Sequence, residues 1–180
     1  MISLFGQNVG VKILNFFIFH AREEIHLKGV AKKLKISPST VKTYCDIFEK
    51  ENLLNVKVQG NLRIFSLNNG SVFVKELKKI FALLFFKTLG IEKIIQDGSL
   101  AVYGSYASGD FDEESDIDLI VISDEKNVDK NFVLKFEKEA GKQVQLTILP
   151  YYKWEKMKNK KEQFALEVLE KHILIEGEKL

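Results

Sequence analysis

The chain has 180 residues, of which 46% are hydrophobic and 29% are charged, and this composition indicates a globular protein of one domain or two small ones. No apolar run approaches the roughly 20 residues of a membrane span, the N-terminus lacks the pattern of a signal peptide, and Cys45 is the only cysteine. A membrane partner, a disulfide framework and a cysteine-based zinc site are therefore excluded, and we expect a cytoplasmic protein.

The charges are distributed unevenly along the chain. Residues 1–70 carry ten lysines and arginines against five aspartates and glutamates, a net charge of +5. Because the whole chain carries +2, the remainder carries −3. A basic first part joined to a mildly acidic second part suggests two units with different partners, although an asymmetry of this size also arises by chance.

The first part has the start and stop signals of short helices. Residues 11–21 are apolar on most sides and predict a buried helix. Ser37 followed by Pro38 predicts the start of another helix, over residues 38–50, with Ser37 as its N-cap. Asn52, just after that helix, is a suitable residue for a left-handed cap.

A hairpin pattern follows these helices. Residues 55–58 and 62–67 read as two short strands around a turn that contains Gly60. Helix, short helix, turn, capped helix and hairpin is the order of a winged helix-turn-helix, and the resemblance covers roughly residues 8–68. We therefore expect a first domain over residues 1–69.

In that fold the helix over residues 38–50 lies in the DNA major groove, and the hairpin reaches an adjacent groove. Arg63, near the predicted hairpin tip, is suited to a narrow minor groove. The alternative is that the unit serves as a dimerisation or scaffold module. The outward residues of the helix that can bond phosphates or base edges are Ser39, Thr40, Lys42 and Thr43.

A long helix is predicted over residues 71–89, within a connecting segment at residues 70–90. Its apolar face is wide, and a face of this width needs cover on more than one side. The cover is either the second domain or a second copy of the chain, which would make a homodimer. The residues of the predicted face are Val72, Phe73, Leu77, Ile80, Phe81, Leu84 and Phe85, and Leu83 and Phe86 widen it at the far end.

The most informative stretch joins a Gly-Ser pair to an Asp-x-Asp pair. An apolar strand over residues 100–103 leads into Gly104 and Ser105, and the next residues can begin a helix. A strand that passes through Gly-Ser into a helix N-terminus presents backbone N–H groups and a hydroxyl to an anion, and glycine lets a phosphate approach the backbone closely. Asp116 and Asp118 then precede an apolar run.

Asp116 and Asp118 are two residues apart, and residues at this spacing in a strand project from the same face. Ile117, between them, then points to the core. Two adjacent carboxylates repel one another unless a cation lies between them. Mg²⁺ prefers one or two carboxylates together with phosphate oxygens. The stretch therefore predicts a metal–nucleotide site.

The same stretch, G-S-Y-A-S-G followed by S-D-I-D-L-I-V, resembles the signature of the nucleotidyltransferase superfamily that includes polymerase beta. It is similar above all to small prokaryotic, archaeal-type nucleotidyltransferases with an N-terminal winged helix. The resemblance implies that Gly104, Ser105 and Ser115 bind the nucleotide, and that Asp116 and Asp118 are catalytic and hold two Mg²⁺ ions. The implied reaction transfers a nucleoside monophosphate from an NTP to an acceptor hydroxyl.

One departure from the superfamily concerns the third carboxylate that a later strand usually supplies. The corresponding strand here, predicted over residues 142–149, contains no acid. Gln145 is the expected equivalent position. An amide can ligate weakly or orient a water, but it cannot act as a base, so metal–nucleotide binding is better supported than turnover.

The last part of the chain alternates helices and strands. A helix is predicted over residues 131–140, two more follow, and a terminal strand is expected over residues 172–175. Trp154 and Tyr152 could stack on a base, but such residues are more often core, and we expect core. A lysine cluster is interpreted as a solvated face rather than a phosphate or RNA site; it comprises Lys156, Lys158, Lys160 and Lys161.

Together these patterns predict an α+β protein, with a winged helix-turn-helix followed by a nucleotidyltransferase-fold domain, a mixed sheet flanked by helices, over residues 91–180. The expected function is transfer of NMP from Mg-NTP to an unknown acceptor, with DNA as a partner of the winged helix. Some proteins of this family act with a partner protein, so a protein partner or target is also considered. The alternative is a DNA-binding regulator whose second domain only binds nucleotide or dimerises.

Overall fold

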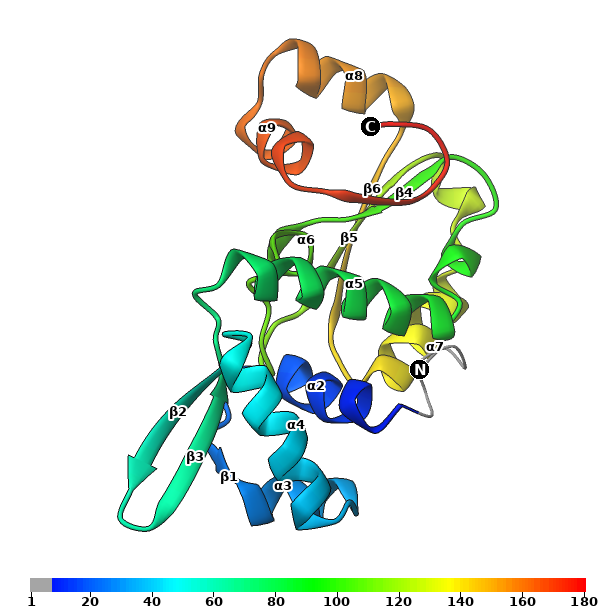
Figure 1. Cartoon of the computed structure of the whole chain (residues 1–180). Coiled ribbons are helices and arrows are strands. Elements are labelled where there is room, and N and C mark those ends of the chain that lie inside the picture. Colours follow the sequence, from blue (N-terminus) through cyan, green and yellow to red (C-terminus); the bar gives the residue numbers. More distant parts are fainter. Residues whose placement is uncertain (1–7) are drawn as a thin grey trace. The chain divides into compact units, whose positions relative to one another are not determined.

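The computed structural model describes residues 8–180, which form two compact units (Figure 1). Unit 1 comprises the described chain up to Phe81 together with the segment Phe111–Glu114. Unit 2 comprises Ala82–Asp110 and Ser115–Leu180. No helix within residues 8–180 is both long and apolar enough to cross a membrane.

Unit 1 combines short helices with a small antiparallel sheet. Strand β3 is central and pairs with β1 on one side and with β2 on the other, so that Phe65 lies opposite both Ile25 and Val56. The elements are α2 (Val9–Phe19), β1 (Ile25–His26), α3 (Leu27–Leu34), α4 (Pro38–Lys50), β2 (Leu54–Gln59) and β3 (Leu62–Leu67).

The predicted helix signals of unit 1 are confirmed. The Ser37 hydroxyl accepts a hydrogen bond from the Thr40 N–H at the start of α4, and Pro38 occupies the first helical turn. Asn52 has the left-handed conformation expected of it, with φ of 56°. The core that these helices enclose consists of fully buried side chains; it includes Ile13, Phe17, Ile18, Val30, Val41, Cys45 and Phe65.

Helix α5 (Val72–Thr88) runs from unit 1 into unit 2, and its predicted apolar face is only partly buried. Val72, Phe73 and Ile80 are 75%, 61% and 51% exposed, which corrects the prediction at these positions. The buried line of the helix consists of Val74, Lys78, Ala82 and Phe86, four residues apart, and of these the prediction included only Phe86. A lysine stands in this line, and a pattern search that counts only apolar residues therefore misses it.

The buried Lys78 is accommodated within unit 1. Its ammonium group donates to the Asn69 side-chain oxygen at 3.3 Å and lies 4.8 Å from the centre of the Phe111 ring. Phe111 is itself 1% exposed and also contacts the ring of Phe19, with 5.8 Å between centroids. A hydrogen bond and an aromatic face thus compensate part of the cost of burying this cation.

Unit 2 is built on a four-stranded mixed sheet in the order β6-β5-β4-β7, in which β5 and β6 are parallel and the other pairs are antiparallel. Its strands are β4 (Ser99–Val102), β5 (Ile117–Ile122), β6 (Val144–Leu149) and β7 (Ile173–Glu176). Its helical elements, besides the end of α5, are η1 (Ile91–Ile94), α6 (Gly104–Ser108), η2 (Glu125–Asn127), α7 (Lys130–Ala140), α8 (Tyr151–Asn159) and α9 (Gln163–Glu170). The α+β class and the mixed sheet are confirmed.

Helices α8 and α9 pack together beside this sheet (Figure 1). Trp154 on α8 is 1% exposed and belongs to an apolar cluster with Ile120, Leu149 and Val168, as expected of a core residue. Tyr152 is 75% exposed, so the expectation that it is core is wrong. The two side chains lie on different faces because residues two apart in a helix diverge by about 200°.

Candidate nucleotide site

Strands β4 and β5 bring the Gly-Ser pair to the Asp-x-Asp pair. Val102 lies opposite Leu119 in the antiparallel register, and the Tyr103 N–H donates to the Asp118 carbonyl at 3.0 Å. Gly104 follows directly and has φ of +65°. A Cβ at Gly104 would lie only 2.2 Å from the Asp118 Oδ2, so no side chain fits between this turn and the carboxylate. Glycine is therefore required here both by backbone conformation and by space.

The turn after β4 forms the short helix α6. Tyr103 occupies its N-cap position without a side-chain capping bond, and Ser105 is half-buried in the first turn. The Ser105 carbonyl accepts from the Ser108 hydroxyl at 3.2 Å and from the Asp110 N–H at 3.0 Å. These bonds fix the turn while its first N–H groups point away from the helix, an arrangement suited to an anion.

Asp116 and Asp118 flank Ile117, the first residue of β5, which is completely buried. Both aspartates are half-buried. Burial raises the pKa of the Asp118 carboxyl above its ordinary value, and the negative charge of Asp116 raises it further. Both effects disfavour the ionised form of Asp118 relative to that of a free aspartate, and a cation bound beside the two carboxylates would act in the opposite direction.

Gln145 joins the pair from the neighbouring strand. In the parallel β5–β6 register Gln145 lies beside Asp118. Its side-chain Nε2 donates to the Asp116 Oδ2 at 2.9 Å. The structure thus brings Gln145, which the sequence suggested as the third position, next to the two aspartates. The role of Gln145 at the site stays a prediction. Ser115 is half-buried and directly precedes Asp116, near the N-terminal end of β5.

The residues present fit a magnesium ion. Within residues 8–180 no cluster of three or more histidine, cysteine, aspartate or glutamate side chains is poised to bind a metal. The available donors are therefore two carboxylates and the Gln145 amide, on adjacent strands. This set is too small for a site made of protein alone, but it matches the one or two carboxylates that Mg²⁺ uses beside substrate phosphates.

The segment between the two motifs, Phe111–Glu114, is held by unit 1, which the sequence did not indicate. The Arg22 N–H donates to both carboxylate oxygens of Glu113, at 3.1 and 3.2 Å. The Arg22 guanidinium pairs with Glu114 at 2.7 Å and with Asp112. The main chain and the guanidinium of Arg22 thus anchor this acidic segment.

The residues proposed for DNA contact lie on α4 and β3 of unit 1. Ser39, Lys42 and Thr43 are exposed and Thr40 is half-buried. Arg63 sits in β3 opposite Val58, in the second residue pair from the turn, near the hairpin tip as predicted.

The two cations of this surface already have acidic partners. Lys42 pairs with Asp46 at 2.8 Å, and Arg63 pairs with Asp46 at 2.6 Å and with Glu49. Hydrogen bonds from Lys42 and from Arg63 lower the pKa of Asp46. DNA phosphates would have to compete with these carboxylates.

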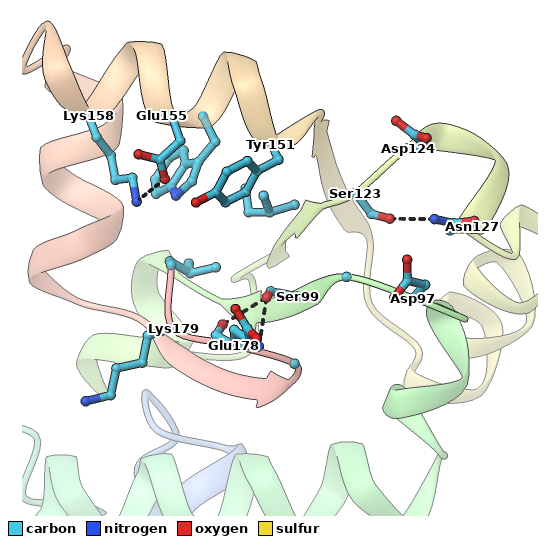
Figure 2. A pocket seen from close by; sticks show the side chains of 15 residues that line it. Asp97, Ser99, Ser123, Asp124, Asn127, Tyr151, Glu155, Lys158, Glu178 and Lys179 are labelled. Atoms are coloured by element: carbon cyan, nitrogen blue, oxygen red, sulfur yellow. Dashed lines mark hydrogen bonds and ion pairs between the residues drawn. The ribbon is translucent and has the colours of Figure 1, made fainter.

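A cavity of about 520 Å³ lies at the other end of the sheet of unit 2 (Figure 2). It is lined by the start of β4, the end of β5, α8 and the C-terminal segment. Ser99 pairs with Ile122 at this end of the ladder, four residues along β5 from Asp118, or about 13 Å. The cavity is thus separate from the aspartate pair, and its polar wall includes the Ser123–Asn127 hydrogen bond of 2.9 Å.

A protein-family model described as "Nucleotidyltransferase domain" matches residues 86–175, half of the chain. The chain belongs to this nucleotidyltransferase domain family. The matched region includes Gly104, the aspartate pair and Gln145. Among solved structures the chain is similar to AF1382 from Archaeoglobus fulgidus, with 19% identity over 46% of this chain and 94% of that one and a TM-score of 0.39. No curated protein matches the chain.

Proposed function

We propose that the nucleotidyltransferase domain transfers a nucleoside monophosphate from Mg-NTP to an acceptor hydroxyl. The observation that carries the proposal is the close approach of Gly104 to the Asp118 carboxylate, which sets the first backbone N–H groups of α6 beside the aspartate pair. Gly104, Ser105 and Ser115 would bind the triphosphate, and Asp116 and Asp118 would hold the metal.

Mg²⁺ bound at the pair would neutralise charge on the phosphates and on the leaving pyrophosphate. The backbone N–H groups at Gly104 and Ser105 orient the phosphate chain. The acceptor oxygen forms a bond to the α-phosphorus while the bond from that phosphorus to the bridging oxygen breaks, and pyrophosphate leaves. The acceptor proton passes to solvent. Gln145 offers no basic atom, and its amide keeps Asp116 oriented through the 2.9 Å hydrogen bond.

The direct test is a transfer assay with each α-³²P-labelled NTP, Mg²⁺ and a cell extract as the source of acceptors. The proposal expects label in a macromolecule or small product with the wild type, and none with Asp116→Asn or Asp118→Asn. Activity that survives both substitutions contradicts the assignment of the site.

A second candidate function, a DNA-binding regulator, is favoured by unit 1. Its element order, its antiparallel sheet β1-β3-β2 and the exposed polar face of α4 support the proposal that it acts as a winged helix-turn-helix. In this function DNA would be bound by Ser39, Thr40, Lys42 and Thr43 of α4 and by Arg63, and the second domain would only bind nucleotide.

The ion pairs of α4 provide the test. If Lys42 and Arg63 contact DNA phosphates, Glu49→Gln releases Arg63 from one carboxylate and strengthens duplex binding, whereas Arg63→Ala weakens it. Electrophoretic mobility shifts at two salt concentrations measure the duplex affinity of each variant. Equal binding by wild type, Glu49→Gln and Arg63→Ala removes support for the regulator.

A further inference from the structure

Helix α8 carries an exposed aromatic ring among lysines on its outer face. Tyr152 is 75% exposed and its neighbour Tyr151 is 68% exposed, whereas Trp154, on the inner side of the helix, is 1% exposed. Lys156 and Lys160 follow Tyr152 at intervals of four residues, so the three side chains form one row along the helix. Lys153 and Lys161 flank the row, and all four lysines are exposed.

These lysines differ from Lys42 and Arg63, the two cations proposed for DNA contact, in having no acidic partner. Within residues 8–180, none of Lys153, Lys156, Lys160 and Lys161 forms an ion pair, whereas Lys42 and Arg63 are both paired. The one glutamate of the helix, Glu155, pairs with Lys158 at 2.7 Å on the cavity side (Figure 2). Residues 151–161 therefore carry five lysines against one glutamate, in a part of the chain that is otherwise acidic.

Lys161 adds an observation about the backbone. It has φ of 54°, a conformation that glycine or asparagine adopts at lower cost. A glycine at this position would therefore remove the charge and relieve the backbone strain together.

We propose that the outer face of α8 binds single-stranded nucleic acid. Lysines spaced by one helical turn, about 6 Å, can follow the phosphates of an extended strand, and the Tyr152 ring offers a platform for one base. An unstacked base is available in a single strand but not inside a duplex. The proposal goes beyond NMP transfer and beyond duplex binding by unit 1, because it names another ligand and another surface.

The test is fluorescence anisotropy of labelled 20-nucleotide RNA and DNA strands with the full chain, without NTP, at several salt concentrations. Tyr152→Ala is expected to weaken binding about 5- to 150-fold, the range of base–aromatic stacking. Lys156→Ala and Lys160→Ala are each expected to reduce the slope of log affinity against log salt by about 0.7. RNA and DNA strands compared side by side decide which strand is preferred.

Two sets of variants separate binding from folding and from general charge. Lys161→Gly relieves the backbone strain, so its melting temperature is expected to equal or exceed that of the wild type while its affinity falls. Lys93→Ala and Lys138→Ala remove exposed lysines elsewhere in unit 2 and are expected to leave affinity unchanged.

Four outcomes overturn the proposal: no binding of either strand, unchanged binding in Tyr152→Ala, an equal loss in the Lys93 and Lys138 controls, and competition by polyglutamate as effective as by unlabelled strand. The last result would assign the face to acidic proteins instead. Because NTP is absent, none of these outcomes bears on the proposed transfer reaction.

Discussion

The side-chain amide of Gln145 donates a 2.9 Å hydrogen bond to the Asp116 carboxylate from the adjacent parallel strand. The amide neutralises part of the repulsion between Asp116 and Asp118 without adding a third negative charge. The Gln145 amide distinguishes this site from one with three carboxylates. The stability of the protein with and without Mg²⁺ should therefore depend on the residue at position 145.

Gln145→Glu is predicted to destabilise the metal-free protein and to increase the stabilisation by Mg²⁺. The substitution removes a hydrogen bond worth about 1 kcal/mol and adds a third negative charge beside the pair. Thermal melts with and without Mg²⁺ measure both effects. Gln145→Leu removes the same bond without adding charge, so it should melt earlier without the larger Mg²⁺ response. Equal Mg²⁺ responses in the two variants would contradict the placement of the metal at this pair.

Gly104→Ala is predicted to abolish NTP binding and to lower the free energy of unfolding by more than the ~1–2 kcal/mol of left-handed backbone strain. Its Cβ would lie 2.2 Å from the Asp118 Oδ2, so the turn or the carboxylate must move. Gly141→Ala is a matched control, since Gly141 has φ of +64° and no atom within 4 Å of its Cβ position. Chemical denaturation of both variants should therefore show the larger loss for Gly104→Ala.

Cys45 is predicted to be inert in the folded protein at pH 8. Burial is the main reason that its pKa is raised to about 12, so the thiol stays protonated far above neutral pH and no thiolate attacks a reagent. Reaction with an aromatic disulfide reagent should be complete within minutes in guanidinium chloride and negligible without it. Fast labelling of the folded protein would mean that the core around α4 opens readily.

Arg22→Ala is predicted to make the Phe111–Glu114 segment accessible to a glutamate-specific protease. The substitution removes the guanidinium contacts to Asp112 and Glu114, while the main-chain bonds to Glu113 stay. Cleavage after Glu113 or Glu114 should become several-fold faster, because the segment opens more often. Lys33→Ala, which removes the Lys33–Glu23 ion pair of the same unit, serves as the control. Identical cleavage rates in all three proteins would show that Arg22 does not anchor the loop.

Much of the site could be predicted from local sequence because its parts are close along the chain. Asp116 and Asp118 share a face through the two-residue period of a strand, and Gly104 is demanded by a turn that begins one residue after β4. The Gln145 contact depends on the register between β5 and β6, which are far apart in sequence. The lack of an acid in the predicted strand pointed to Gln145 as the third position. The hydrogen bond from Gln145 to Asp116 could not be predicted, because it depends on that register.

The errors have physical causes as well. Lys78 occupies the buried line of α5, and the apolar pattern therefore assigned Val72, Phe73 and Ile80 to the buried face although they are exposed. Tyr152 looked like a core residue because aromatic side chains usually are, yet its angular separation from Trp154 places it in solvent. Arg22 contacts the acidic segment about 90 positions further along the chain. No local sequence pattern predicts a contact between residues so far apart.

The most direct test of the account is calorimetric titration of each NTP into the protein with and without Mg²⁺. The account predicts binding that requires Mg²⁺ and is lost in the Asp116→Asn/Asp118→Asn double variant. Asp97→Asn/Asp124→Asn, at the opposite end of the sheet, should bind as the wild type does. No heat with any NTP, or equal binding by the wild type and the Asp116→Asn/Asp118→Asn variant, would contradict a metal–nucleotide site at this pair.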